Sequence, residues 1–461
     1  MNVILISIML YLVAQLALAF WLSRRNRNET DYLLAGRRLG PWMGTFTVFA
    51  TWFGAETCVG AAGEAYANGL SGVLAEPFGY TLGLVLAGLL FAVPLWNRGL
   101  VTFADLFHQR YGIGVERLAA IIMIPSSVMW AAAQIRAFGQ VLASASELGL
   151  LAAITLAAFV VICYTAVGGM WADAVTDLLQ GIVLILGVAA LFAVFVSLGG
   201  LTHLAALSPA RFDPMHGHTW LDALNTLAVP VFSTIAAQEL YSRVLAMRGA
   251  KLARNATVVA GVLYLLVGAV PVILGLGASL YIGEHRDQEQ VLAVFAQQHL
   301  SLPLYILFLG ALVSAILSTL SGALLVAGSL AAHNVIAPLK RGMTDKAKLA
   351  ANRWAVIVFG VVAYGIALAA QSVYDLVQES SSLGTSGILV MMLFALWGGR
   401  VGGAASGYAA LIAGTGAFLF CEHVLKTDYS YLASIAAAAV AYLALAPLRL
   451  RSRPDAQPAA R

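Results

Sequence analysis

The sequence predicts an all-α integral membrane protein with about thirteen transmembrane helices in a single domain. Three observations support this class. The chain is 61% hydrophobic and only 10% charged, whereas a soluble domain carries about 25% charged residues. Its mean hydropathy is +0.87. Apolar runs of about 20 residues, the length that crosses a bilayer, follow one another almost from end to end. A soluble fold could not bury this much apolar surface, so lipid must be the solvent for much of it.

Thirteen apolar spans can be read along the chain. They lie near residues 2–22, 41–67, 72–95, 118–146, 150–168, 174–198, 221–246, 255–282, 302–336, 354–371, 376–398, 403–422 and 429–448. We expect the first to be a retained span, because the basic residues follow its apolar run, whereas a secretory signal begins with them. One transmembrane domain over 1–450 and a short cytoplasmic tail over 451–461 are expected.

Lysine and arginine residues predict the orientation, because cytoplasmic loops are enriched in them. With the N-terminus outside, 22 of the 26 basic residues fall inside, Arg243 among them. Three fall outside, and Arg136 lies within a span. The chain is therefore expected in an inner or plasma membrane, with its N-terminus outside and its C-terminus cytoplasmic. The net charge of +4 reflects these loops and does not indicate a nucleic-acid partner.

Two spans combine helix-breaking residues with a carboxylate. The second span contains glycines around Glu56, and the seventh contains Pro230 and Glu239. These spans open two five-span blocks, about 41–198 and 221–398. Interrupted helices at matching places in two halves indicate a transporter binding site. Glycine alone could reflect close helix packing, but an ionisable group within the membrane is a functional hypothesis by default.

Hydroxyl side chains at Ser318 and Thr319 are candidates for holding an alkali cation. Hard cations prefer oxygen ligands, and carbonyls at a helix break would add more. Asp177 in the sixth span could add a negative charge. The same hydroxyls could instead bond to the preceding helical turn, and the residues alone leave both interpretations open.

The chain resembles the sodium:solute symporter family over about residues 1–450. The stretch from Gly168 and Gly169 to Gln180 is similar to that family's motif around its fifth core helix. The resemblance implies a LeuT-like 5+5 inverted repeat, with one extra helix before it and two after it.

The resemblance also implies where sodium binds. Some members have a second sodium site, for which Asp177 and Ser321 match, but Gly322 stands where a second hydroxyl is usual. The first site would use three carbonyls and two hydroxyls, those of Ala50, Phe53, Ala315, Ser318 and Thr319.

Within the family, residues 51–140 are most similar to the high-affinity choline transporters. The matching stretches are Thr-Trp-Phe-Gly at 51–54, Glu-Pro-Phe-Gly-Tyr at 76–80 and Met-Trp-Ala-Ala-Ala at 129–133. Aromatic faces attract quaternary ammonium groups. The resemblance implies that Trp52, Tyr80 and Trp130 belong to an aromatic cage. The remaining tryptophan position of that cage is Ala237 here. Simple core packing is the alternative for each tryptophan.

Charged side chains distinguish this chain from that subfamily. Glu56, Glu239 and Glu379 could bind an amine directly. Arg136 could pair with Glu56 or Glu239 as a structural ion pair, or could bind a substrate carboxylate through two hydrogen bonds. The other candidate substrate residues are Gln238 and Tyr241, the latter at the position of an inner aromatic gate in the family.

These features predict a transporter and not an enzyme. We expect a symporter that couples Na+ to import of a small organic solute by alternating access, and we favour a nitrogen-containing cation or zwitterion such as a choline-like amine. An amino acid or carboxylate is the alternative solute. Proton coupling, or a membrane sensor with a separate partner, are alternatives from other classes. The expected partners are the solute, sodium and lipid, with no nucleic acid and no obligate protein partner. No nucleotide-binding glycine loop is present, so ATP is not the expected energy source.

Overall fold

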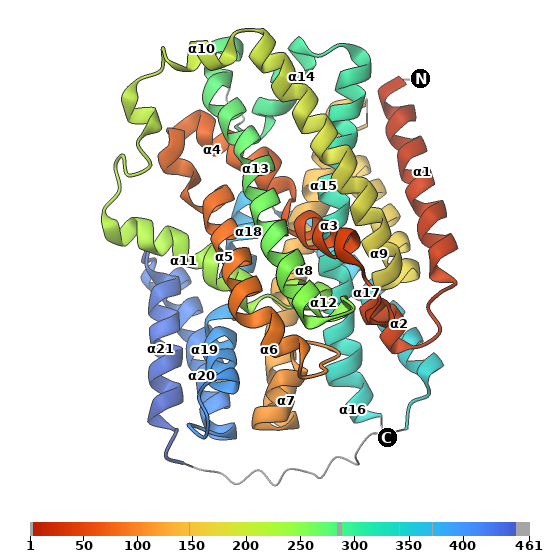
Figure 1. The fold of residues 1–461 in the computed structure, drawn as a ribbon, viewed down its shortest axis with the longest axis vertical. Helices are drawn as coiled ribbons and strands as arrows, with labels where there is room; N and C mark the ends of the chain where they lie inside the picture. The colour runs from red at the N-terminus through yellow and green to blue at the C-terminus, as the bar shows by residue number, and fades with distance from the viewer. Residues whose placement is uncertain (1–2, 147, 284–287, 341, 371, 449–461) are drawn as a thin grey trace.

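The computed structural model describes residues 3–146, 148–283, 288–340, 342–370 and 372–448. The predicted tail over 451–461 lies outside these residues. In the described part the chain is helical, and no β-strand occurs there. Most helices run along the long axis of the molecule and pack into a bundle (Figure 1). The predicted all-α membrane architecture is confirmed.

Nine helical stretches among the described residues are long and apolar enough to cross a membrane, and a bent pair would make ten. Two predicted spans, 150–168 and 174–198, fall in the 48-residue helix α9. The last predicted span is the 15-residue helix α21, Ser430–Ala444. The count of thirteen therefore stays a prediction. The nine stretches are α1 (Val3–Ser23), η2 to α6 (Glu56–Trp96), Ile113–Ser144 of α8 (Ile113–Ala145), α9 (Leu150–Ser197), α13 (Ala250–Ile282), α15 to α16 (Leu302–Leu339), α17 (Asp345–Ala369), Leu376–Leu396 of α18 (Val373–Ser382) and α19 (Thr385–Leu396), and α20 to η9 (Ala404–Leu425).

Helix α9 changes direction at Gly169. This glycine has φ +65° and ψ −178°, a backbone conformation that residues with a Cβ rarely adopt. A Cβ there would also lie 2.6 Å from the ring of Tyr32, in the short helix α2 (Glu29–Leu34). The turn at Gly169 separates the two spans that the sequence predicts within α9.

Both predicted helix interruptions are confirmed. Helix α3 (Pro41–Trp52) ends where Phe53 and Gly54 leave helical geometry, and the chain resumes through η2 (Glu56–Gly60) into α4 (Ala61–Asn68). Helix α11 (Trp220–Ala236) meets α12 (Gln238–Ala246) at a 41° bend. The break lies at Ala237, with φ −79° and ψ 125°, while Pro230 remains inside α11.

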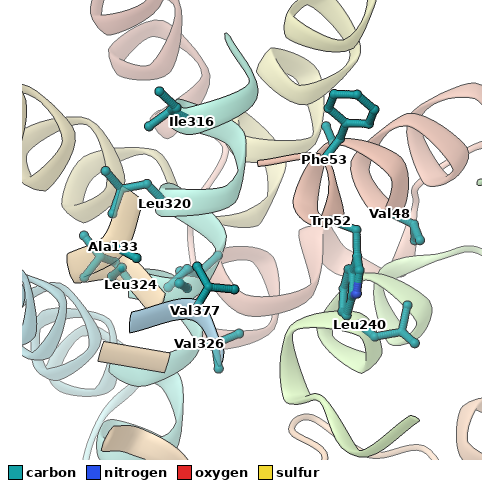
Figure 2. Close-up of a cluster of buried hydrophobic side chains, with 14 of the residues drawn as sticks. Val48, Trp52, Phe53, Ala133, Leu240, Ile316, Leu320, Leu324, Val326 and Val377 are labelled. Carbon is teal, nitrogen blue, oxygen red and sulfur yellow. The ribbon is translucent and has the colours of Figure 1, made fainter. Parts of the chain in front are cut away.

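Helix α15 (Leu302–Ser329) forms the centre of the bundle. In its most apolar stretch 78% of the residues are buried, against 22% in α1 at the periphery. Figure 2 shows its apolar side chains, including Ile316 and Leu320, across from Trp52 and Phe53 at the end of α3. Leu240 of α12 packs in the same region. Both broken helices therefore contact the central helix.

Candidate sodium and solute sites

The end of α3 releases two backbone carbonyls. The Gly54 amide donates to the Trp52 carbonyl at 3.0 Å, and the Ala55 amide donates to Oε1 of Gln134 at 3.1 Å. In a continuous helix these amides would bond to the carbonyls of Ala50 and Thr51. Both carbonyls are therefore available to other partners.

Four of the five predicted sodium ligands meet at this break. The Ser318 hydroxyl lies 2.9 Å from the carbonyls of both Ala50 and Ala315. The Thr319 hydroxyl lies 3.3 Å and 3.1 Å from the same two carbonyls. Phe53, the fifth, forms the break itself, with φ −84° and ψ 79°. The hydroxyls bond to their own helical turn and to α3 at once, so oxygens of two helices converge.

Glu56 approaches the same break from its other side. A Cβ built on Gly54 would lie 2.6 Å from Oε2 of Glu56 and 3.0 Å from Oγ1 of Thr319. Nε2 of Gln134 donates to Glu56 at 2.8 Å. One side-chain amide therefore bonds both to this carboxylate and to the Ala55 N–H at the break. Sequence reasoning missed Gln134. Its signal was an amide two residues before Arg136 in a predicted membrane span, and it is completely buried.

A cavity between the broken helices collects the predicted aromatic side chains. Trp52, Tyr80 and Trp130 all line it. The two tryptophan rings lie 5.8 Å apart, edge to face, and Nε1 of Trp52 donates to the Thr234 hydroxyl at 3.0 Å. Ala237 lines the same cavity, so the position that lacks a tryptophan does face this space.

Glu239 places a carboxylate on this cavity. It is 5% exposed and accepts a hydrogen bond from the Ser127 hydroxyl at 2.5 Å. Ser127, which sequence reasoning missed, lines the cavity too, as does Gln238. No lysine or arginine lines it in the part of the chain that the structure describes. The cavity therefore combines aromatic faces with one carboxylate.

Other predicted substrate residues do not line this cavity. Glu56 lines a neighbouring one. Nη1 of Arg136 donates to the Ala367 carbonyl at 3.2 Å. The Tyr241 hydroxyl donates to the Ile235 carbonyl at 2.7 Å. Glu379 is 42% exposed and lies 3.6 Å from His423. Contact of these four side chains with solute stays a prediction.

Another buried glutamate, Glu76, appears in the sequence analysis only as part of a motif. It is 5% exposed, and Oε2 accepts a hydrogen bond from the Tyr264 hydroxyl at 2.6 Å. Tyr264 also contacts the Thr57 hydroxyl at 2.7 Å. This carboxylate is thus held by neutral groups from α13 and η2.

The residues predicted for a second sodium site have different partners. Oδ2 of Asp177 accepts from the Thr47 hydroxyl at 2.5 Å, while the Ser321 hydroxyl donates to Asp173. Asp173 also pairs with Arg243 at 2.5 Å. The interpretation of Arg243 as a cytoplasmic loop residue is wrong, because this side chain lies in α12 and is completely buried.

The broken helices, the converging oxygens and the adjacent cavity are together the features of a membrane transporter, with the candidate ion and solute sites at one helix break. The chain belongs to the sodium:solute symporter family, whose sequence profile it matches over residues 32–414. It is therefore a sodium-coupled solute symporter and not an enzyme.

Known proteins agree with this assignment. The chain is 30% identical over 410 residues to "High-affinity choline transporter 1" of Drosophila melanogaster, covering 82% of this chain and 64% of the fly protein. It is 29% identical to "High affinity choline transporter 1" of Homo sapiens, covering 88% and 75%. A solved structure of a Na+-coupled sialic acid symporter matches with a TM-score of 0.84 at 18% identity, covering 96% and 97%. That likeness confirms the LeuT-like fold.

Proposed function

We propose that this symporter uses inward sodium movement to import a small nitrogen-containing cation or zwitterion, such as a choline-like amine. The supporting observation is a single cavity lined by Trp52, Tyr80, Trp130 and Glu239. Aromatic faces attract quaternary ammonium groups, with a larger gain when the cation is desolvated. A bound cation would also compensate the buried charge of Glu239, which is otherwise costly at this depth.

Coupling follows from the shared helix break. Ala50 and Trp52 belong to the last turn of α3, so a sodium ion held by the Ala50 carbonyl fixes the position of the Trp52 ring. Each ligand then raises the affinity of the other by the same factor. With the N-terminus outside, the membrane potential favours inward movement by about 2.3 kcal/mol per charge per 100 mV. Import by alternating access follows when both ligands are released inside.

The carboxylate alternative has less support. It relies on a basic side chain at the solute, and Arg136 bonds to the Ala367 carbonyl away from the residues that line the cavity. An amino acid would keep its ammonium group near Glu239, but its carboxylate would depend on hydroxyls and on Gln238. We therefore favour a solute that is held through a cationic nitrogen group over one that is held through its carboxylate.

Replacing the cavity carboxylate tests the proposal. Glu239→Gln keeps the shape but removes the charge. A quaternary ammonium has no N–H to donate, so what it loses is electrostatic attraction, and a close opposite charge is worth about 1–3 pKa units, or about 1.4–4 kcal/mol. Binding of a choline-like amine should therefore weaken by about tenfold or more. The measurement is uptake and equilibrium binding of radiolabelled choline by purified protein in liposomes, with an inward sodium or potassium gradient.

The matched control is Glu422→Gln, a glutamate on the exposed surface of η9, which should leave choline uptake unchanged. Uptake driven by potassium as well as by sodium would contradict sodium coupling. If Glu239→Gln binds choline as well as the unaltered protein does, the solute is not held by this carboxylate. Competition by amino acids or carboxylates, but not by amines, would move the solute to the alternative class.

A further inference from the structure

Arg243 is a fully buried cation at the centre of the helix bundle. Its side chain is 0% exposed. A charge in this position is costly unless opposite charge and hydrogen bonds compensate it. Nη2 lies 2.5 Å from Oδ2 of Asp173, Nε donates to Oγ1 of Thr51 at 2.9 Å, and Nη1 donates to Oγ of Ser242 at 2.9 Å. The guanidinium thus links α12 to both α9 and α3.

The oxygens around this guanidinium are those that a hard cation prefers. Oδ1 of Asp173 accepts a hydrogen bond from Ser321 of α15. Asp177 lies one turn further along α9 and accepts from Thr47 of α3 at 2.5 Å. Carboxylate and hydroxyl oxygens are hard ligands. The Ser321 hydroxyl is also 3.2 Å from the Ser318 carbonyl, so this cluster adjoins the first sodium site.

Gly322 reveals how tightly the guanidinium fits there. A Cβ on this glycine would lie 2.6 Å from Nη2 and 3.2 Å from Cζ of Arg243. A hydroxyl-bearing side chain at position 322 would therefore collide with the arginine. Since the neighbouring Ser321 hydroxyl is directed to Asp173, α15 offers no free hydroxyl at either position.

We propose that the guanidinium of Arg243 permanently occupies the place of a second sodium ion, so that each transport cycle carries one sodium. The proposal rests on the sodium coupling proposed above. A guanidinium stays protonated in proteins and cannot dissociate, so it compensates Asp173 in every step of the cycle. Oδ1 of Asp177 has no hydrogen-bond partner among the described residues. A second sodium ion at this place would need that oxygen as a ligand. The experiment therefore replaces Asp177.

Counting bound sodium ions tests this proposal without knowledge of the solute. Purified full-length protein is equilibrated with radioactive sodium, and the ions bound per protein are measured at saturation. We expect one ion for the unaltered protein and still one for Asp177→Asn. The double variant Arg243→Gln with Gly322→Ser removes the cation and supplies a hydroxyl, and its count should rise to two. Arg248→Gln, an exposed arginine just beyond α12, is the matched control and should bind one.

Two outcomes would overturn the proposal. One is a count of two for the unaltered protein that falls to one in Asp177→Asn. The other is a count of one for a double variant that remains monodisperse and melts cooperatively. If the double variant does not fold, the counts for the unaltered protein and for Asp177→Asn decide. A count of zero for the unaltered protein would instead remove the sodium coupling on which the proposal rests.

Discussion

At the scale of single residues, what makes Ser318 and Thr319 candidate sodium ligands is the helix that they face. Hydroxyls within helices commonly bond to the preceding turn, and both do so here through the Ala315 carbonyl. What distinguishes them is the second contact, to the Ala50 carbonyl at the end of α3. That contact exists because Ala50 has lost its helical partner.

The double variant Ser318→Ala with Thr319→Ala should weaken sodium binding while the protein still inserts. Losing two oxygen ligands, at about 1 kcal/mol each, predicts a decrease in apparent sodium affinity of more than about tenfold. The sodium-dependent increase in thermal stability measures it, because a ligand of the folded state stabilises by mass action. Ser329→Ala removes a buried hydroxyl further along α15 that bonds only within its own turn, and should change nothing. An unchanged sodium response in the double variant would remove these two ligands from the site.

At the scale of helices, the two breaks place polar groups at the candidate sodium and solute sites. Helix α3 ends at Trp52 because the next amides do not continue its hydrogen-bond pattern. The Gly54 amide donates to the Trp52 carbonyl, and the Ala55 amide donates to the Gln134 side chain. Gly54 permits the approach of Glu56 and Thr319 at this point. At Ala237, one extended residue directs Gln238 and Glu239 into the cavity. In both helices the irregular backbone is buried or lines a cavity, as the membrane requires.

Gly54→Ala should abolish sodium-dependent uptake without preventing insertion. The added methyl group would lie 2.6 Å from Oε2 of Glu56 and 3.0 Å from Oγ1 of Thr319, so it would push the carboxylate and the sodium ligand apart. Uptake by proteoliposomes and the thermal shift in sodium are the measurements. Gly365→Ala, within α17 and with no atom near the added methyl group, should retain full activity. Normal uptake by Gly54→Ala would show that the break tolerates a side chain.

At the scale of the whole molecule, an ion-pair network ties four elements together towards the lower end in Figure 1. The ring nitrogens of His333 lie 3.1 Å from Glu29 and 3.4 Å from Asp105, and Lys348 lies 3.4 Å from Glu29. Burial alone would raise the pKa of Asp105, but hydrogen bonds and attraction from His333, with the Thr102 and Val101 amides, outweigh it and lower the pKa. Burial alone would also raise the pKa of Glu29, but hydrogen bonds and attraction from His333 and Lys348 outweigh it and lower this pKa too. The network therefore joins α2, α7 (Asp105–Tyr111), η8 (Leu330–Ile336) and α17.

This network predicts a pH-dependent stability. A carboxyl whose folded pKa is lowered contributes stability above its unfolded pKa, about 4, and loses it as the pH falls through the folded pKa. Asp105→Asn should therefore lower the melting temperature at neutral pH, and the difference from the unaltered protein should shrink below about pH 4. Thermal unfolding in detergent between neutral and acidic pH measures it. A difference that does not vary with pH would mean that Asp105 stabilises the fold by shape alone.

The sequence by itself determined the class of protein, most of the membrane spans and both interrupted helices. These features are local, because an apolar run, a glycine pair or a carboxylate inside an apolar run can be recognised within one segment. The choice of Ser318 and Thr319 relied on a motif resemblance, and the structure brings them to Ala50. The position of Gly169 likewise matched the boundary between two predicted spans.

Only the tertiary structure decided which polar groups meet. Arg243 looked like a loop cation, yet it is buried against Thr51, 192 residues away in the chain, and Asp173. Gln134 was one of several polar residues in its predicted span, yet it bonds to both the backbone and Glu56 at the break of α3. Arg136 lies within a predicted span, and the carbonyl that its Nη1 bonds to, that of Ala367, is 231 residues away in the chain. The physical reason is the same in each case. The partner of a buried polar group is set by the packing of helices distant in sequence, and no local pattern records that packing.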